Sequence, residues 1–340
     1  MLMNAGGRHV DLAFSSHSFF RGGHAQTLAG LYLPSQTPDY SAIQHEVRLP
    51  DGDAIVLHDD QPVGWTPGSR VALLIHGLAG CHGSGYMRRV ASKLNRLGVR
   101  TFRLDMRGMG AAAGRARGLA HAGRHADAHA ALTTIGELCP RSPIVMIGFS
   151  LGGNITLNCL ALESPLPAHV ERAIVVSPPT DLQECCDQLR HGVRRAYDRY
   201  LLRLLCSAWL RAGGKLPARR PRSLFEFDDL ITAPHSGFRN AEDYYAQSSS
   251  GPRMSGISTP VRILAAADDP MVPVRSIRKF PRSKSVELCV TATGGHLGFI
   301  GRRKEVPDRR WMDHLILRWL GPWESVHDPL SDPCFGHEPD

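Results

Sequence analysis

The chain has 340 residues, of which 42% are hydrophobic and 21% are charged. This composition is ordinary for a globular protein with one large α/β domain, with or without an inserted subdomain, and it excludes a disordered or fibrous chain. The formal net charge is +8, but Lys and Arg are scattered and no recognised nucleic-acid-binding motif accompanies them. We therefore expect no nucleic-acid partner.

The cysteines and the apolar runs indicate the compartment. None of the eight cysteines forms a Cys-x-x-Cys pair. This usage favours free thiols in a reducing compartment over a disulfide framework. The chain shows no signal-peptide pattern and no apolar run long enough to cross a membrane. We expect a cytoplasmic protein.

Residues 1–39 are predicted to form an N-terminal extension. Its most distinctive part is residues 23–28, Gly-His-Ala-Gln-Thr-Leu, to which spacing alone assigns no chemistry. Strand-like runs at 43–49 and 54–58 flank Asp51-Gly52. An Asp-Gly pair between two such runs predicts a hairpin, here of antiparallel edge strands.

From residue 71 onward, strand and helix patterns alternate. Such alternation predicts right-handed crossovers and a mostly parallel central sheet with helices on both faces, over a core of about 40–179 and 258–322. Residues 323–340 are expected to be a C-terminal tail. Buried strands are predicted at 71–75, 99–104, 144–147, 173–176, 261–265 and 286–290. Helices are predicted at 86–97, 128–138 and 154–162. The last helix of the core is predicted to begin at Pro307-Asp308 and to end at Gly321-Pro322.

Residues 180–257 interrupt this alternation. They begin with one predicted helix, 186–210, which carries an apolar stripe and, on another face, Arg195, Arg199 and Arg203. An insertion here would cover the carboxyl ends of the strands, where open α/β sheets bind ligands, so we interpret it as a helical cap or lid. The arginines could contact lipid headgroups weakly, or simply face solvent.

The run 144–147 leads directly into Gly148-Phe149-Ser150-Leu151-Gly152. Gly-x-Ser-x-Gly after a buried strand and before a helix is the nucleophile-elbow pattern. The serine occupies a strained turn in which larger side chains two positions away would collide, and the helix amides that follow can stabilise an oxyanion. Ser150 is the predicted nucleophile.

A serine nucleophile needs a base and an acid that orients the base. In proteins with a nucleophile elbow these residues follow along the chain in the order serine, acid, histidine. Asp268 and Asp269 follow the strand 261–265, and His296 lies in a glycine-containing loop after 286–290. Neighbouring side chains in an extended segment point opposite ways, so one aspartate can face the histidine. Hydrolases with this turn commonly place the acid just before x-x-Val-Pro, a frame that Asp269 fits.

The loop after the strand 71–75 reads His76-Gly77-Leu78-Ala79-Gly80. It is the expected source of the second oxyanion amide, from Leu78, beside that of Leu151. His121, His125 and His129 are spaced by four and could share a helix face, but nothing at ligand spacing supports them. We expect neither a metal nor a cofactor.

Several stretches together resemble the YheT-like group of α/β-hydrolases, which includes eukaryotic α/β-hydrolase-domain lipases and yeast medium-chain ethyl ester synthase/esterases. Where that group often has Arg-Gly-Cys-Gly-Gly, this chain continues from Arg107-Gly108 as Met109-Gly110-Ala111. The resemblance covers roughly 20–320 and implies carboxylic-ester hydrolysis, with some members acting on lipids or transferring acyl groups to alcohols. The matching stretches lie at 23–28, 76–80, 105–108, 148–154, 225–229, 241–245, 267–270 and 294–299.

These observations predict a serine esterase for short- to medium-chain acyl esters. Ser150 would attack the ester, His296 would take its proton, Asp269 would orient His296, and the amides of Leu78 and Leu151 would hold the oxyanion. The expected partner is a small-molecule ester; the sequence does not indicate an oligomeric state. An acyltransferase, lipase or thioesterase using the same residues, or a non-catalytic binding protein of this fold, are the alternatives.

Overall fold

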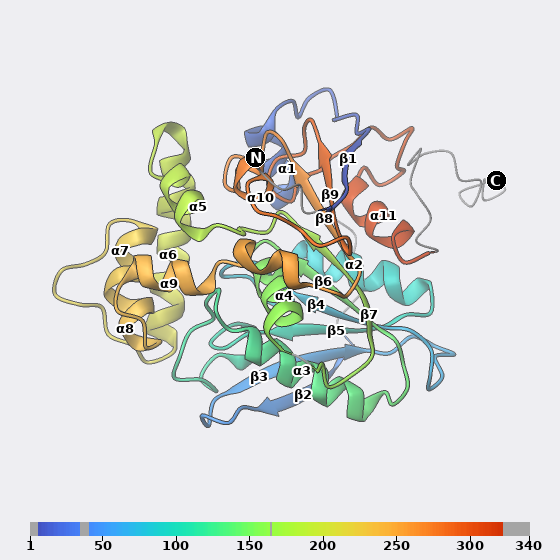
Figure 1. Cartoon of the computed structure of the whole chain (residues 1–340), viewed down its shortest axis with the longest axis horizontal. Helices are drawn as coiled ribbons and strands as arrows, with labels where there is room; N and C mark the ends of the chain where they lie inside the picture. Colours follow the sequence, from blue (N-terminus) through green and yellow to red (C-terminus); the bar gives the residue numbers. More distant parts are fainter. Residues whose placement is uncertain (1–5, 35–40, 164, 322–340) are drawn as a thin grey trace.

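The computed structural model describes residues 6–34, 41–163 and 165–321, and its centre is a nine-stranded sheet of order β1-β9-β8-β7-β6-β4-β5-β3-β2 (Figure 1). β3 pairs antiparallel with β2 and β5, and every other neighbouring pair is parallel. The predicted mostly parallel sheet is confirmed. The strands are β1 (His9–Leu12), β2 (Ile43–Arg48), β3 (Ala54–Asp60), β4 (Val71–Ile75), β5 (Arg100–Asp105), β6 (Ile144–Phe149), β7 (Val170–Val176), β8 (Val261–Ala266) and β9 (Val286–Thr291).

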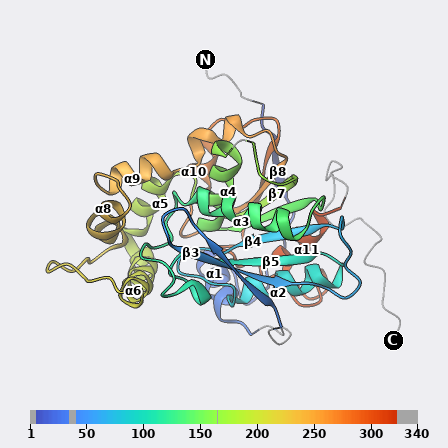
Figure 2. The same cartoon turned by 90° about the horizontal axis from the view of Figure 1, so that it is seen from below.

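Helices cover both faces of the sheet, because the central strands are apolar on both. Along β4, Leu73 packs into the core beneath α3 and α4, whereas Leu74 packs into the core beneath α2 and α11. Figure 2 shows α3 and α4 on the opposite side of the sheet from α2. Each such buried leucine contributes roughly 1.5–3 kcal/mol of transfer free energy. These four helices are α2 (Gly85–Arg96), α3 (His125–Leu138), α4 (Leu151–Leu162) and α11 (Trp311–Arg318).

The remaining helices include a group that lies together at one side of the sheet, α5 to α9 (Figure 1). These belong to the predicted insertion, 180–257. Their bounds are α5 (Leu182–Leu189), α6 (Arg195–Arg211), α7 (Leu224–Phe227), α8 (Ala233–His235) and α9 (Ala241–Ser248). Outside this group lie α1 (Gly23–Tyr32) and α10 (Val274–Arg278). A π-helical turn, Asp228–Thr232, joins α7 to α8.

Two predicted helices need correction. The single helix expected over 186–210 is two, because Gly192 has a φ of 57° and breaks the path between α5 and α6. The last helix starts at Trp311 and not at Pro307, because Arg309 has a φ of 62° and belongs to the preceding turn. Neither break is apparent from the spacing of apolar residues.

The ends of the sheet also differ from expectation. Two parts of the predicted N-terminal extension join the main fold: His9–Leu12 pairs in parallel with β9 as an edge strand, and 23–32 form α1. At the other edge β2 alone is terminal, and β3 is an interior strand. Four residues are too few to show an alternating pattern, which explains why β1 was missed. The predicted tail, 323–340, lies outside the described residues.

Candidate active site

Ser150 lies in the turn between β6 and α4. Its φ of 51° and ψ of −118° place it outside the regions that most residues adopt, as an elbow requires. A Cβ atom added at Gly152 would lie 2.3 Å from the carbonyl oxygen of Ile75, so only glycine allows α4 to pack this closely on the end of β4. The local sequence thus holds the Ser150 side chain at the carboxyl end of the sheet.

His296 contacts both Ser150 and Asp269. Its Nε2 lies 2.9 Å from Ser150 Oγ, and its Nδ1 lies 2.9 Å from Asp269 Oδ2. Asp269 Oδ1 accepts hydrogen bonds from the backbone amides of Met271 and Val272. An imidazole that donates from Nδ1 to the carboxylate leaves Nε2 to accept the serine proton. Three residues from three strand ends therefore form one hydrogen-bonded chain.

The neighbouring Asp268 points elsewhere. Its Oδ1 accepts a hydrogen bond of 2.9 Å from the amide of Gly295, in the loop that carries His296. Burial raises the pKa of the Asp268 carboxyl. The structure thus brings Asp269, and not Asp268, to the histidine ring, and Asp268 contacts a loop amide.

The stretch 23–28, to which the sequence assigned no chemistry, supports the histidine loop from α1. Thr27 Oγ1 accepts the backbone N–H of His296 at 2.9 Å and donates to the carbonyl of Gly23. The fully buried Gln26 donates to the carbonyl of Ile300 and accepts from its amide. Sequence reasoning missed both residues; the one available signal was a glutamine and a threonine inside an otherwise unassigned motif.

The predicted oxyanion residues line the same cavity as Ser150. The first helical hydrogen bonds of α4 run from Gly153 and Asn154 to the Ser150 carbonyl, so the amide of Leu151 precedes them and has no helical partner. Leu78 lies in a tight turn closed by a hydrogen bond from Gly80 to Gly77. The roles of these two amides remain predictions.

A cavity of about 850 Å³ extends from Ser150 between the sheet and α5, α6 and α7. This volume is at the upper end of the range for small-molecule sites. The described wall is mainly apolar, with Leu182, Leu189, Leu201, Leu204, Leu205 and Leu224 among its residues. Its polar members include Asp228, whose carboxylate accepts from the hydroxyls of Tyr245 and Thr232, each at 2.7 Å. Burial raises the pKa of Asp228 to about 6.

Other features noted in the sequence are not gathered into sites. His121 precedes α3 and packs edge-on against Phe238 and Tyr244, while His125 lies 2.7 Å from Glu163, so the three histidines do not share one helix face. The three arginines of α6 are exposed, and their contact with lipid headgroups stays a prediction. Within the described ranges, no helix is both long and apolar enough to span a membrane.

Comparisons with known proteins identify relatives of this chain. The family described as serine aminopeptidase, S33, matches residues 67–298. The protein named "Putative esterase YheT" from Escherichia coli K12 is 32% identical over 308 residues, covering 87% of this chain and 89% of its own. Monoacylglycerol lipase of Saccharomyces cerevisiae is 28% identical over 322 residues, covering 88% of this chain and 68% of its own.

Solved structures show the same fold at low identity. The Pyrococcus furiosus esterase Pf2001 superposes with a TM-score of 0.53 at 17% identity, covering 85% of this chain and 99% of that one. A 2,6-dihydroxy-pseudo-oxynicotine hydrolase gives a TM-score of 0.55 at 19% identity, covering 81% and 67%. With the match over 67–298 and the YheT relative, these findings establish that the chain belongs to the serine aminopeptidase S33 family of α/β-hydrolases, in its YheT-like group.

Proposed function

We propose that this esterase/lipase-type hydrolase cleaves carboxylic esters of short- to medium-chain acyl groups through an acyl-enzyme on Ser150. The observation that carries the proposal is the position of His296, 2.9 Å from both Ser150 Oγ and Asp269 Oδ2. Relatives named as an esterase and as a monoacylglycerol lipase support ester substrates.

The mechanism follows from the protonation states that these contacts allow. Ser150 Oγ attacks the ester carbonyl as His296 Nε2 takes its proton, and Asp269 stabilises the imidazolium. The amides of Leu78 and Leu151 are proposed to donate to the oxyanion. The intermediate collapses, the alcohol leaves with the proton from His296, and a water molecule activated by the same ring releases the acid.

The acyl-chain preference is proposed from the cavity. Apolar side chains of α5, α6 and α7 line it, and transfer of each methylene from water to such a wall is worth about 0.8 kcal/mol. The volume of about 850 Å³ gives an acyl chain room beyond the reacting carbon. We therefore expect activity to rise from acetate to medium-chain esters, and a panel of p-nitrophenyl esters from acetate to palmitate measures the preference.

The nucleophile is tested with Ser150→Ala. The variant should fold and lose at least about 10³-fold in kcat, since removal of a triad nucleophile in other hydrolases costs this much or more. A fluorophosphonate probe should label the native protein and not the variant. Ser207→Ala, on the exposed side of α6, is the control and should keep both properties. Near-normal ester turnover by Ser150→Ala would contradict the proposal.

A further inference from the structure

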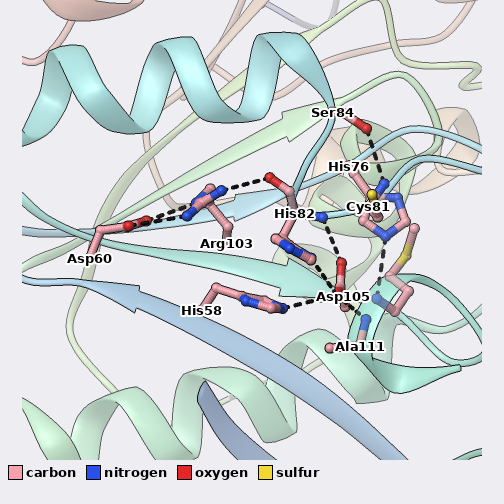
Figure 3. Close-up of polar contacts among 10 residues, drawn as sticks. His58, Asp60, His76, Cys81, His82, Ser84, Arg103, Asp105 and Ala111 are labelled. Atoms are coloured by element: carbon pink, nitrogen blue, oxygen red, sulfur yellow. Dashed lines mark hydrogen bonds and ion pairs between the residues drawn. The ribbon is translucent and has the colours of Figure 1, made fainter. Parts of the chain in front are cut away.

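Asp105, at the carboxyl end of β5, is a fully buried carboxylate. It is not part of the hydrogen-bonded series formed by Ser150, His296 and Asp269. Figure 3 shows it at the centre of a group of polar contacts. Its Oδ1 accepts the backbone N–H of His82 at 2.6 Å. Its Oδ2 accepts from the ring of His82 at 2.7 Å, the ring of His58 at 2.9 Å and the amide of Ala111 at 2.6 Å. The carboxylate thus joins three separate segments.

His82 belongs to the loop between β4 and α2, the same loop that carries Leu78. Asp105 holds its backbone N–H and its ring Nδ1, and Arg103 donates to its backbone carbonyl at 2.8 Å. Arg103 is itself paired with Asp60 on β3. Residues of β5 therefore fix His82 through both its backbone groups and its side chain.

The other end of this loop is fixed by different contacts. His76 donates from Nδ1 to the Gly77 carbonyl at 2.7 Å, and its Nε2 accepts the amide of Met106. The amide of Gly77 donates to Tyr86 Oη at 2.9 Å. Leu78 lies between these contacts and the hydrogen bonds of His82, so its amide direction depends on both ends of the loop.

The residues His58, His82 and Asp105 are also of metal-binding types, and their ligand atoms lie within 4.8 Å of one another. The two imidazole rings, however, stack with centroids 3.6 Å apart and planes only 15° from parallel. Both rings also approach the same carboxylate oxygen, Asp105 Oδ2, at 2.9 and 2.7 Å, which are ordinary hydrogen-bond distances, so each ring bonds directly to the carboxylate. The arrangement suits two imidazole rings that each donate to a carboxylate.

The charges agree with this interpretation. Burial lowers the pKa of His58, which favours its neutral form. Burial alone would raise the pKa of Asp105, but the hydrogen bonds from His58 and His82 hold it well below its usual range. The close approach of Gly110 adds to the enclosure, because a Cβ there would lie 2.1 Å from Asp105 Oδ2.

We propose that Asp105 is a positioning residue for catalysis, acting through His82 to hold the Leu78 amide towards the oxyanion. This inference rests on the proposed function, because Leu78 matters only if an oxyanion forms beside Ser150. Removing one oxyanion donor outright costs about 10²- to 10³-fold in other hydrolases. Loosening its loop should cost less.

The test is Asp105→Asn, which places an amide N–H₂ among the donors that now converge on the carboxylate. For p-nitrophenyl acetate we expect kcat to fall about 10- to 100-fold with KM changed less than about twofold, since the loop contributes to the transition state and not to the cavity that binds the ester. The affinity for an alkylboronic acid, which mimics the tetrahedral state, should fall by the same factor as kcat/KM. A merely structural defect would not produce that match.

Asp59→Asn is the matched control. Asp59 lies on β3, is buried like Asp105 and is paired with Arg100 and His45; none of these hydrogen bonds, which are those that the described part of the chain shows for its side chain, reaches the loop. It should lower the melting temperature and leave kcat within about twofold. Equal losses of kcat in the two variants, or an unchanged kcat in Asp105→Asn, would overturn the inference.

Two further measurements keep the test decisive. If Asp105→Asn does not fold, His82→Ala removes the ring's hydrogen bond to Asp105 and its stacking on His58 at a half-buried position, and it should lower kcat about three- to tenfold at constant KM. Amide hydrogen exchange of residues 77–82 should accelerate in either variant, even if the native protein hydrolyses no ester. That outcome would refute the proposed function while showing that Asp105 orders the loop, whereas unchanged exchange with normal esterase activity would refute the inference alone.

Discussion

Two regions of the protein each hold a buried carboxylate near the cavity: Asp228 lines it, and Asp269 contacts His296, which lines it. Asp269, at the sheet, is 6% exposed and accepts from two backbone amides and faces His296. Asp228, in the helical region, is 7% exposed and accepts from two hydroxyls; among the described residues no cation pairs with it. Asp269 accepts from two backbone amides and the His296 ring, whereas the two hydroxyls at Asp228 offset its burial only in part, so the pKa of Asp228 is raised. The contacts at the sheet therefore suit a charged carboxylate, whereas the helical region mainly supplies apolar side chains to the cavity wall.

The largest effect should come from removing the charge at the sheet. Asp269→Asn keeps the size of the side chain but removes the negative charge beside His296 Nδ1, so the imidazolium loses its partner and the ring can adopt the wrong tautomer. We expect kcat to fall by about 10⁴-fold, as when a triad acid becomes an amide in other enzymes. Steady-state hydrolysis of p-nitrophenyl acetate measures the loss.

Asp268→Asn is the control for that substitution, because it alters the adjacent carboxylate, whose contact is the Gly295 amide. It should cost far less, within about tenfold, since it changes the support of the loop and not the charge on the ring. The reverse ranking of the two variants would assign the orienting role to Asp268.

An intermediate effect should come from reshaping the helical region. Leu204 lines the cavity from α6. Leu204→Trp should fill part of the acyl space, lowering kcat/KM for decanoate esters about tenfold while acetate esters change less than about twofold. Leu210→Trp, at an exposed position of the same helix, is the control. A uniform change across all chain lengths would show that α6 does not select the acyl group.

The last effect concerns stability and not rate, and it should appear in the pH dependence of unfolding. The pKa of Asp228 is about 6 in the folded protein, above the roughly 3.9 of an unfolded aspartate. The folded state therefore binds more protons between about pH 4 and pH 6, and stability falls as pH rises through that range, by about 2–3 kcal/mol in all. Asp228→Asn should remove this dependence.

Melting temperatures of the two proteins at pH 5 and pH 7.5 provide the measurement. The melting temperature of Asp228→Asn minus that of the native protein should be several degrees higher at pH 7.5 than at pH 5. This expectation does not depend on the absolute stability of the variant. Asp187→Asn, at a half-exposed position of α5, should show no such gain. If the melting temperature of Asp228→Asn instead falls relative to that of the native protein at the higher pH, the Asp228 carboxylate is stabilised as an anion. The two regions then do not differ as described.

Local patterns in the sequence determined the sheet and the elbow. A buried strand is a short apolar run and a helix is a period of 3.6, so the strands β4 to β9 and the helices α2 to α4 could be located by composition and spacing. Ser150 could be placed because the two glycines beside it meet a steric requirement of the turn itself. His296 and Asp269 could be proposed because each follows a predicted strand, and strands of a parallel sheet end at one edge.

Only the tertiary structure decided which polar groups meet across the chain. Thr27 contacts the amide of His296, 269 residues away, and Asp105 joins His58 to His82, so no spacing rule could relate them. The break at Gly192 and the edge strand β1 likewise depend on what the rest of the chain packs against them. A hydrogen bond needs only two groups close in space, whereas a pattern in sequence can report only the groups that are close along the chain or repeat with the period of one element.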